Sequence, residues 1–199
     1  MKSDRRVRKT KYSIREALIE LIEKKGFENI TVTDITTKAD INRGTFYLHY
    51  EDKFDLLRGI EEEIFIEFGH HIKKLPLSVF SSDSIDEKLL HYLTAVIEYI
   101  SENKRLFRAI LGPAGDPQFY HSLKKFMIAS VFNSNNSNAI LKYSDTPIEF
   151  YTNYVASAQL GVIQLWLEQE SDFTPLELAN FLTLMFEHGP KNILKKQYD

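Results

Sequence analysis

Arg43, Gly44 and Tyr47 are the residues of this 199-residue chain whose types and spacing could do chemistry together. If residues 43–50 form a helix, Arg43 and Tyr47 lie on one face with Gly44 beside them. A guanidinium group can bind the O6 and N7 edge of guanine with two hydrogen bonds, and a tyrosine ring can contact a thymine methyl group or a phosphate. Glycine has no side chain to hold the backbone away from a ligand. The pattern indicates a helix face that fits a nucleic-acid groove.

Capping signals place this helix directly after a tight turn. Thr31 and Asp34 are spaced to satisfy the first amides of a short preceding helix. Asp40 tolerates the left-handed backbone that a tight turn needs, and Asn42 can cap the next helix, expected over residues 43–50. Two short helices joined by a turn of about three to four residues predict a helix-turn-helix.

An amphipathic helix before this pair supplies the core that the pair needs. Its apolar stripe has helical spacing and consists of Ile14, Ala17, Leu18, Leu21 and Ile22. On the second short helix, Phe46 and Tyr50 face away from Arg43 and Tyr47, so they can pack against the stripe. The face that carries Arg43 is therefore left for a partner.

The net charge of −3 conceals two oppositely charged parts of the chain. Residues 1–58 carry 13 Lys and Arg against 10 Asp and Glu, whereas residues 59–199 carry 12 against 18. A basic head on an acidic body indicates a polyanionic partner at one end. The basic tail, residues 1–11, can add phosphate affinity that weakens with salt, or it is a solvated segment without function.

Several classes of protein are not expected. The chain has no cysteine, so thiolate metal sites, disulfides and cysteine nucleophiles are excluded. The six histidines, at 49, 70, 71, 91, 121 and 188, show no metal-ligand spacing, and no phosphate loop or nucleophile motif is present. We therefore expect no enzyme, no metal and no cofactor. Apolar stretches are too short for a membrane span and no secretory signal is expected, so the predicted location is the cytoplasm.

Helical spacing continues through the rest of the chain, without a convincing alternating strand. Breaks are expected at residues 76–84, 112–117 and 133–138, where proline, glycine, serine and asparagine gather. The predicted fold class is all-α with about nine helices. We expect a three-helix helix-turn-helix domain over residues 1–52, a connecting helix over 53–74, and a larger C-terminal helical domain over 75–199.

The stretch from Ile14 to Leu57 resembles the DNA-binding domain of TetR-type transcriptional regulators. The resemblance rests mainly on the run Gly44-Thr-Phe-Tyr-Leu-His-Tyr50 followed by Lys53, and also on Thr31-Val-Thr-Asp-Ile35. It implies a bacterial regulator that binds a palindromic operator as a homodimer, with one recognition helix of each subunit in successive major grooves. It also implies C-terminal helices that form the dimer interface and commonly an effector pocket.

The resemblance also implies which residues contact DNA. By position, the contacting set is Thr33, Asn42, Arg43, Gly44, Thr45, Tyr47, His49 and Lys53. We assign Arg43, Gly44 and Tyr47 to bases or groove walls. Thr33, Thr45, His49 and Lys53 are assigned to phosphates, although Thr45 can equally be a helix-stabilising hydroxyl. Two positions depart from the family pattern. Asp40 stands where glycine is frequent, and Leu48 stands where a polar or aromatic phosphate contact is common.

The last two helices carry patterns that fit a dimer seam. Small and apolar residues share helical spacing over residues 147–170, and the helix from about Thr174 is apolar on more than one side. The predicted seam consists of Tyr154, Ala158, Gly161, Leu165, Leu178, Phe181, Leu182 and Met185. An ordinary core within one chain is the alternative. The resemblance favours the seam. Operator half-sites ~34–36 Å apart need two helix-turn-helix domains that are linked through a dimer.

An aromatic group in the C-terminal part could line an apolar effector pocket. It consists of Phe107, Phe119, Tyr120, Phe126, Tyr151 and Trp166. Aromatic residues at helical spacing can instead be simple core, so both readings stay open. The C-terminal part also resembles dihydroxyacetone-operon activators of Gram-positive bacteria, which respond to a protein partner. A small apolar or aromatic effector and a protein effector are therefore both candidates.

Together these features predict a sequence-specific, DNA-binding transcriptional regulator. The partners expected are a double-stranded DNA operator and a second copy of the chain, and repression is the expected mode. The alternative is a helical module of the same fold that acts through protein contacts.

Overall fold

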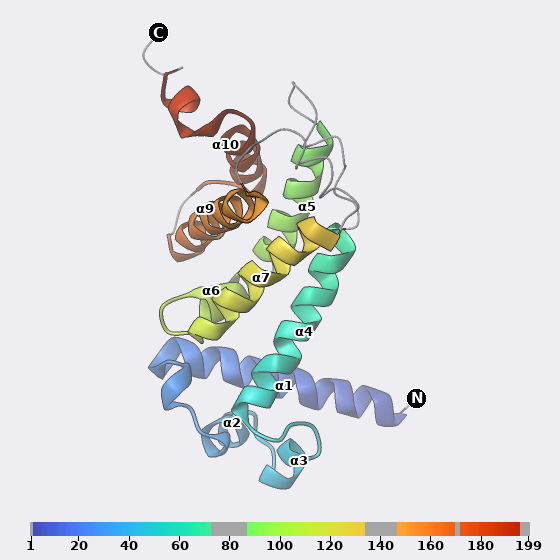
Figure 1. Cartoon of the computed structure of the whole chain (residues 1–199). Helices are drawn as coiled ribbons and strands as arrows, with labels where there is room; N and C mark the ends of the chain where they lie inside the picture. The colour runs from blue at the N-terminus through green and yellow to red at the C-terminus, as the bar shows by residue number, and fades with distance from the viewer. Residues whose placement is uncertain (1, 73–86, 134–146, 170–171, 196–199) are drawn as a thin grey trace. The chain divides into compact units, whose positions relative to one another are not determined.

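The structure is a computed structural model that describes residues 2–72, 87–133, 147–169 and 172–195. Within these ranges the chain forms nine α-helices and one short 3₁₀-helix, and no strand (Figure 1). The predicted all-α class is confirmed. The chain forms two compact units. The first contains the residues up to Phe65 together with Arg105–Tyr120, and the second contains the remaining residues.

The first unit holds the predicted helix-turn-helix. Its elements are α1 (Lys2–Lys25), the 3₁₀-helix η1 (Phe27–Asn29), α2 (Val32–Lys38), α3 (Arg43–Tyr47), the beginning of α4 (Lys53–Ile72), most of α6 (Lys104–Leu111) and the start of α7 (Pro117–Asn133). Ile14, Leu18 and Ile22 of the α1 stripe are fully buried, as are Ile35 of α2 and Phe46 of α3. This core leaves the opposite face of α3 in solvent.

The local signals that begin and end these helices are present. Thr31 caps α2 and forms a reciprocal capping box with Asp34, whose carboxylate accepts from the Thr31 amide at 2.8 Å. Asn42 caps α3 by accepting a hydrogen bond from the Gly44 amide at 2.9 Å. Asp40, in the turn, has a φ of 52°, and is a non-glycine residue in the left-handed region, as the sequence predicts.

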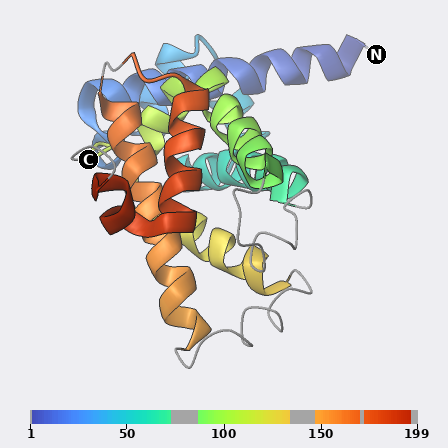
Figure 2. The ribbon, with the colours of Figure 1, turned by 90° about the horizontal axis from the view of Figure 1, so that it is seen from above.

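The second unit contains the other helices. They are α5 (Glu87–Glu102), the end of α4, the rest of α7, α9 (Ile148–Glu168) and α10 (Pro175–Lys195). α10 packs along α5 (Figure 2). Leu178 and Leu182 of α10 and Leu93 and Ile97 of α5 are buried there. A kink interrupts α10 at Gly189, whose φ is 67°.

The structure differs from the expected helices in four places. α1 begins at Lys2, so the part of the basic tail that is described is helical. α3 ends at Tyr47 instead of Tyr50. Between the breaks expected at 76–84 and 112–117, the chain forms two helices instead of one, separated at Asn103. The units also divide the chain differently from the three expected segments, because residues 105–120 group with the N-terminal helices. The breaks expected at 76–84 and 134–138 lie outside the described residues.

Candidate nucleic-acid interface

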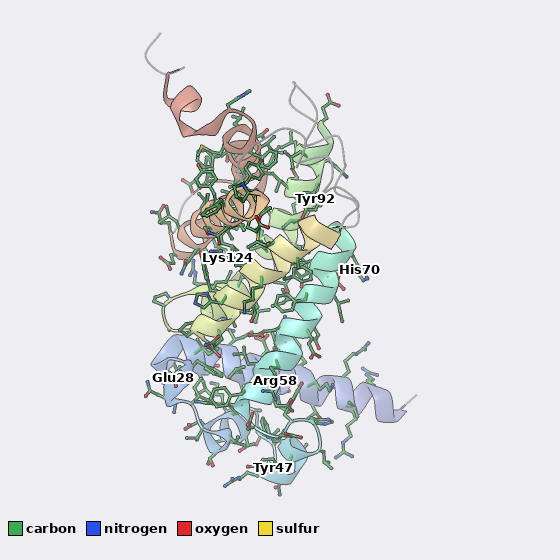
Figure 3. All side chains as sticks on the ribbon, in the orientation of Figure 1. Glu28, Tyr47, Arg58, His70, Tyr92 and Lys124 are labelled. Atoms are coloured by element: carbon green, nitrogen blue, oxygen red, sulfur yellow. The ribbon has the colours of Figure 1, made fainter. Side chains whose placement is uncertain are left out.

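Arg43 and Tyr47 lie together on the exposed face of α3. The Arg43 Nη2 atom donates a hydrogen bond to the Tyr47 hydroxyl at 3.1 Å, and the guanidinium carbon lies 5.9 Å from the centre of the tyrosine ring. Phe46 packs its ring edge-on against Tyr47 from the core side, at 5.6 Å between ring centres. Figure 3 shows Tyr47 at the edge of the unit, on the side of α3 away from α1. The pair is therefore held in place before any partner binds.

Asn42 and Gly44 shape the beginning of α3. The Asn42 side-chain oxygen accepts the capping hydrogen bond from the Gly44 amide, and this bond fixes the orientation of the Asn42 side chain. Gly44 is exposed, and a Cβ atom added there would come no closer than 3.7 Å to another atom, namely Asn42 Oδ1. The fold of this unit therefore does not require glycine at position 44. The absence of a side chain instead leaves the backbone bare on the face that carries Arg43.

Three of the residues predicted to contact phosphate differ in their exposure to solvent. Thr33 is exposed on α2, whereas Thr45 and His49 are half-buried. The His49 ring lies 6.3 Å from the ring of Tyr50, which is also half-buried. The structure brings these residues into the same unit as Arg43. Their contacts with phosphate stay predictions.

Lys53 has contacts that the sequence did not reveal. Its ammonium donates hydrogen bonds to the carbonyl oxygens of Phe27 at 3.0 Å and Glu28 at 2.9 Å. It also lies 4.9 Å from the ring centre of Phe27 and 5.1 Å from that of Phe54. Two of the three donors of the ammonium are thus engaged inside the unit, which leaves one for a phosphate.

Leu48, which is not in the predicted contact set, is also strongly exposed. It follows α3 directly and is 80% exposed, against 49% for Tyr47. Its backbone amide donates to the Gly44 carbonyl at 3.2 Å, so the end of the helix fixes its position. The spacing of Gly44 and Leu48, four residues apart, is the sequence signal that could have placed Leu48 on the exposed face.

Ion pairs fasten the surroundings of α2. Lys25 binds the Asp34 carboxylate at 2.8 Å, and this contact, with the Thr31 hydrogen bonds, holds the pKa of Asp34 well below its ordinary value. Lys24 and Lys38 both pair with Glu20 and lower the pKa of that carboxyl to about 2. These groups all retain contact with solvent, so each pair contributes little to stability.

A cluster of cations covers the first turns of α1. Arg5, Arg6, Arg8, Lys9 and Lys11 are all exposed, and none of them forms an ion pair with a described residue. Lys11 lies 5.9 Å from the ring centre of Tyr50, just after the recognition helix. The cations belong to a regular helix and not to an extended tail.

The six aromatic residues of the predicted pocket are divided between the two units. Phe107 and Phe119 are fully buried in the first unit, where Phe119 stacks on Phe65 at 6.1 Å, and Tyr120 is half-buried. In the second unit Trp166 donates to the Phe173 carbonyl at 2.7 Å, Phe126 is half-buried and Tyr151 is 39% exposed. Each unit therefore uses part of the set in its own packing. The pocket stays a prediction.

The predicted dimer residues fall into two groups. Tyr154, Ala158, Gly161 and Leu165 are all exposed along one stripe of α9. On α10, Leu178 and Leu182 are buried within the chain, whereas Phe181 and Met185 are half-buried. The α9 group is thus available to a second copy. Leu178 and Leu182 are instead part of the core of the second unit.

The described residues also bear on metal sites and membrane spans. No group of three or more histidine, aspartate and glutamate side chains there could hold a metal ion. No described helix is both long and apolar enough to cross a membrane.

The fold and the exposed face of α3 define a helix-turn-helix regulator with a separate C-terminal helical unit. Residues 14–60 match the family model described as bacterial regulatory proteins of the TetR family. Residues 87–188 match a second model, described as a transcriptional regulator C-terminal region. The chain therefore belongs to the TetR family of transcriptional regulators, as the sequence motifs predict.

Named relatives and solved structures agree with this assignment. The HTH-type transcriptional regulator YxbF of Bacillus subtilis is 25% identical over 81% of this chain. The chain spans between 40% and 57% of the length of the curated relatives it matches. A TetR transcriptional regulator from Streptococcus agalactiae is 26% identical, with a TM-score of 0.63 over 94% of this chain and 99% of that one.

Two more distant structures share the fold alone. The regulator FadR from Bacillus subtilis, solved in complex with stearoyl-CoA, has a TM-score of 0.61 at 15% identity and covers 90% of this chain and 98% of that one. The dihydroxyacetone kinase operon activator DhaS has a TM-score of 0.50 at 21% identity and covers 94% and 95%. The predicted likeness to dihydroxyacetone-operon activators thus extends to the fold.

Proposed function

We propose that this protein represses transcription by binding a palindromic DNA operator as a homodimer, in the cytoplasm of a bacterium. The observation that carries the proposal is the Arg43–Tyr47 pair on α3. An arginine held at 3.1 Å from a tyrosine hydroxyl loses less conformational freedom when it binds guanine than a free arginine would. Family membership supports the class of function, and this pair supports Arg43 as the residue that contacts a base.

The surroundings of the pair support a groove-binding role. Exposed Gly44 leaves the backbone of α3 bare beside Arg43, and nothing in the unit calls for a glycine there. The five exposed cations of α1 add positive charge to the same unit. Cations that neutralise phosphates release counterions, so binding should weaken steeply with salt. We assign base contacts to Arg43, Gly44 and Tyr47, and retain Thr33, Thr45, His49 and the remaining donor of Lys53 as phosphate contacts.

The exposed stripe of α9 supports the homodimer. Tyr154 and Leu165 are 59% and 53% exposed, and Ala158 and Gly161 between them leave a shallow, small-residue surface. A contiguous apolar face of this kind on one helix is typical of a protein interface. Leu176 of α10, in the same unit, is also exposed, at 53%. We place the seam on α9 and the outward side of α10.

An effector that alters operator affinity is a further part of the proposal. FadR from Bacillus subtilis was solved with an acyl-CoA, and this supports testing an apolar ligand here. The likeness to DhaS supports testing a protein partner as the alternative. An effector acts only if it binds the DNA-competent and DNA-incompetent states with different affinity. Stearoyl-CoA is a suitable first probe, because its effect on operator binding can be measured directly.

Selection of DNA from a random pool tests the proposal. The purified protein should enrich an inverted repeat with half-sites about one helical turn apart, at physiological salt. A reporter gene placed behind that sequence should be expressed less in cells that contain the protein. If the pool shows no enriched sequence, DNA recognition is contradicted. If expression rises, the protein is an activator and the repressor role is wrong.

A further inference from the structure

Leu48 lies on the same face of the recognition helix as the residues assigned to bases. With about 100° between successive residues of a helix, Arg43, Tyr47, Gly44 and Leu48 span roughly 140° of its circumference. Phe46 lies outside that arc and is fully buried. The exposed face therefore carries a cation, an aromatic ring, a bare backbone and an aliphatic side chain.

The exposed side chain of Leu48 offers apolar surface that a docked partner can cover. A leucine that is 80% exposed keeps almost all of its apolar surface in water. Covering that surface stabilises the complex in proportion to the apolar area removed from water. The side chain has neither a donor nor an acceptor, so it cannot bind the phosphate oxygens that surround a docked helix.

The major groove contains one apolar group that such a side chain can contact. Thymine presents its C5 methyl group there, whereas the other base edges present donors and acceptors. Leu48 is held at the end of α3 by its amide hydrogen bond to the Gly44 carbonyl at 3.2 Å. Its place on the helix end is therefore fixed relative to Arg43 and Tyr47.

We propose that Leu48 determines specificity by packing against the C5 methyl group of a thymine in each operator half-site. This inference rests on the proposed function, because it needs a docked recognition helix. In the family pattern, the position of Leu48 commonly carries a polar or aromatic residue that contacts phosphate. The inference assigns this position an apolar contact with a base instead. Its consequence is a thymine requirement that hydrogen bonding cannot explain.

Replacement of thymine by deoxyuridine tests the inference, since this removes the methyl group and nothing else. A site is first selected with the parent protein, and each thymine is then replaced symmetrically in both half-sites. Binding is measured by fluorescence anisotropy for the parent and for Leu48→Ala. Ile66→Ala is the matched control, because Ile66 is another exposed aliphatic residue, at 59%, on α4. Thermal unfolding of each variant verifies that it is folded.

At one thymine position, we expect deoxyuridine to weaken binding of the parent about three- to tenfold. Leu48→Ala should lose a similar factor on the thymine site and show no further loss on the deoxyuridine site. Ile66→Ala should behave like the parent. The inference is overturned if no position responds to loss of the methyl group, or if Leu48→Ala still responds fully. If no DNA is selected at all, both the proposed function and this inference are contradicted.

Discussion

The Lys53 ammonium donates a hydrogen bond to the Phe27 carbonyl oxygen at 3.0 Å and fastens the first turn of α4 to η1. The amide of Phe27 donates in turn to the Ala114 carbonyl at 2.8 Å, in the turn after α6. Phe27 is buried and packs edge-on against Phe54 at 5.5 Å. Phe27 thus joins the beginning of α4 to the segment 105–120 within the first unit. Lys53 acts here as a structural residue, whatever its contact with phosphate.

Replacement of Lys53 by methionine should lower the free energy of unfolding by about 1–2 kcal/mol, because two carbonyl groups lose a charged donor. Urea denaturation measures this change. The control is Lys125→Met, which removes an exposed lysine of α7 and should leave the unfolding free energy unchanged. An equal stability for Lys53→Met and the parent would mean that the Phe27 and Glu28 contacts contribute nothing.

Arg105 and Glu23 should show a measurable energetic coupling. The Arg105 Nε and Nη2 atoms donate to the Glu23 carboxylate at 3.0 and 2.7 Å, which joins α6 to α1, and this pairing raises the pKa of Arg105. Since both side chains are partly exposed, a double-mutant cycle should give about 0.5–1 kcal/mol. The local pair Arg58 and Asp55, three residues apart, is the control and should couple more weakly. If the effects of Arg105→Ala and Glu23→Ala on the unfolding free energy were additive, the expected coupling would be contradicted.

Glu61 should make stability depend on pH near neutrality. Burial, with a contribution from Asp116, raises the pKa of this half-buried carboxyl to about 7, while Arg58 opposes the shift. The folded state therefore holds the proton more tightly than the unfolded state, whose pKa is near 4.5. The stabilising contribution is complete below that value and is lost as the pH rises through 7.

Glu61→Gln removes this titration and should flatten the unfolding free energy between about pH 5 and pH 8. At the upper end of that range the variant should be more stable than the parent, because no half-buried carboxylate forms. Thermal unfolding across the range is the measurement, with exposed Glu62→Gln as control. Identical pH profiles for Glu61→Gln and the parent would contradict the expected shift.

Gly161→Leu should convert the proposed homodimer to monomer. A Cβ atom at this position would meet no atom of the other described residues within 4 Å, apart from the neighbouring backbone of α9, so the helix itself tolerates a side chain. A partner helix that approaches closely would not, and the dissociation constant should rise at least about tenfold. Sedimentation velocity gives the oligomeric state. Gly69→Leu, on α4, is the matched control because that position is equally open. A dimer that survives Gly161→Leu places the seam elsewhere.

Local chemistry explains what the sequence could predict of this fold. The capping box of Thr31 and Asp34, the cap at Asn42 and the left-handed Asp40 depend on residues within four positions of each other. Such signals can be read from one stretch of chain. Apolar spacing predicted the buried Ile14 and Phe46 for the same reason. The exposed pair of Arg43 and Tyr47 follows directly from these local elements.

What the sequence could not predict depends on distant contacts. Arg105 and Glu23 are 82 positions apart, and Lys53 reaches a carbonyl 26 positions away, so no local pattern indicates either bond. α10 is apolar on more than one side, and only its packing on α5 shows that Leu178 and Leu182 face the chain's own core. The separation of α5 from α6 at Asn103 was likewise hidden, because the apolar spacing continues across it.

Binding of Arg43→Ala to the selected operator is the most direct test of DNA recognition through α3. Fluorescence anisotropy at fixed salt should show a loss of roughly 1–3 kcal/mol relative to the parent, with relaxed preference at the guanine position. Arg58→Ala, a cation of α4 that pairs with Asp55, should bind like the parent. Thermal unfolding should be unchanged, since Arg43 is exposed. Operator affinity and base preference equal to those of the parent would contradict DNA recognition through α3.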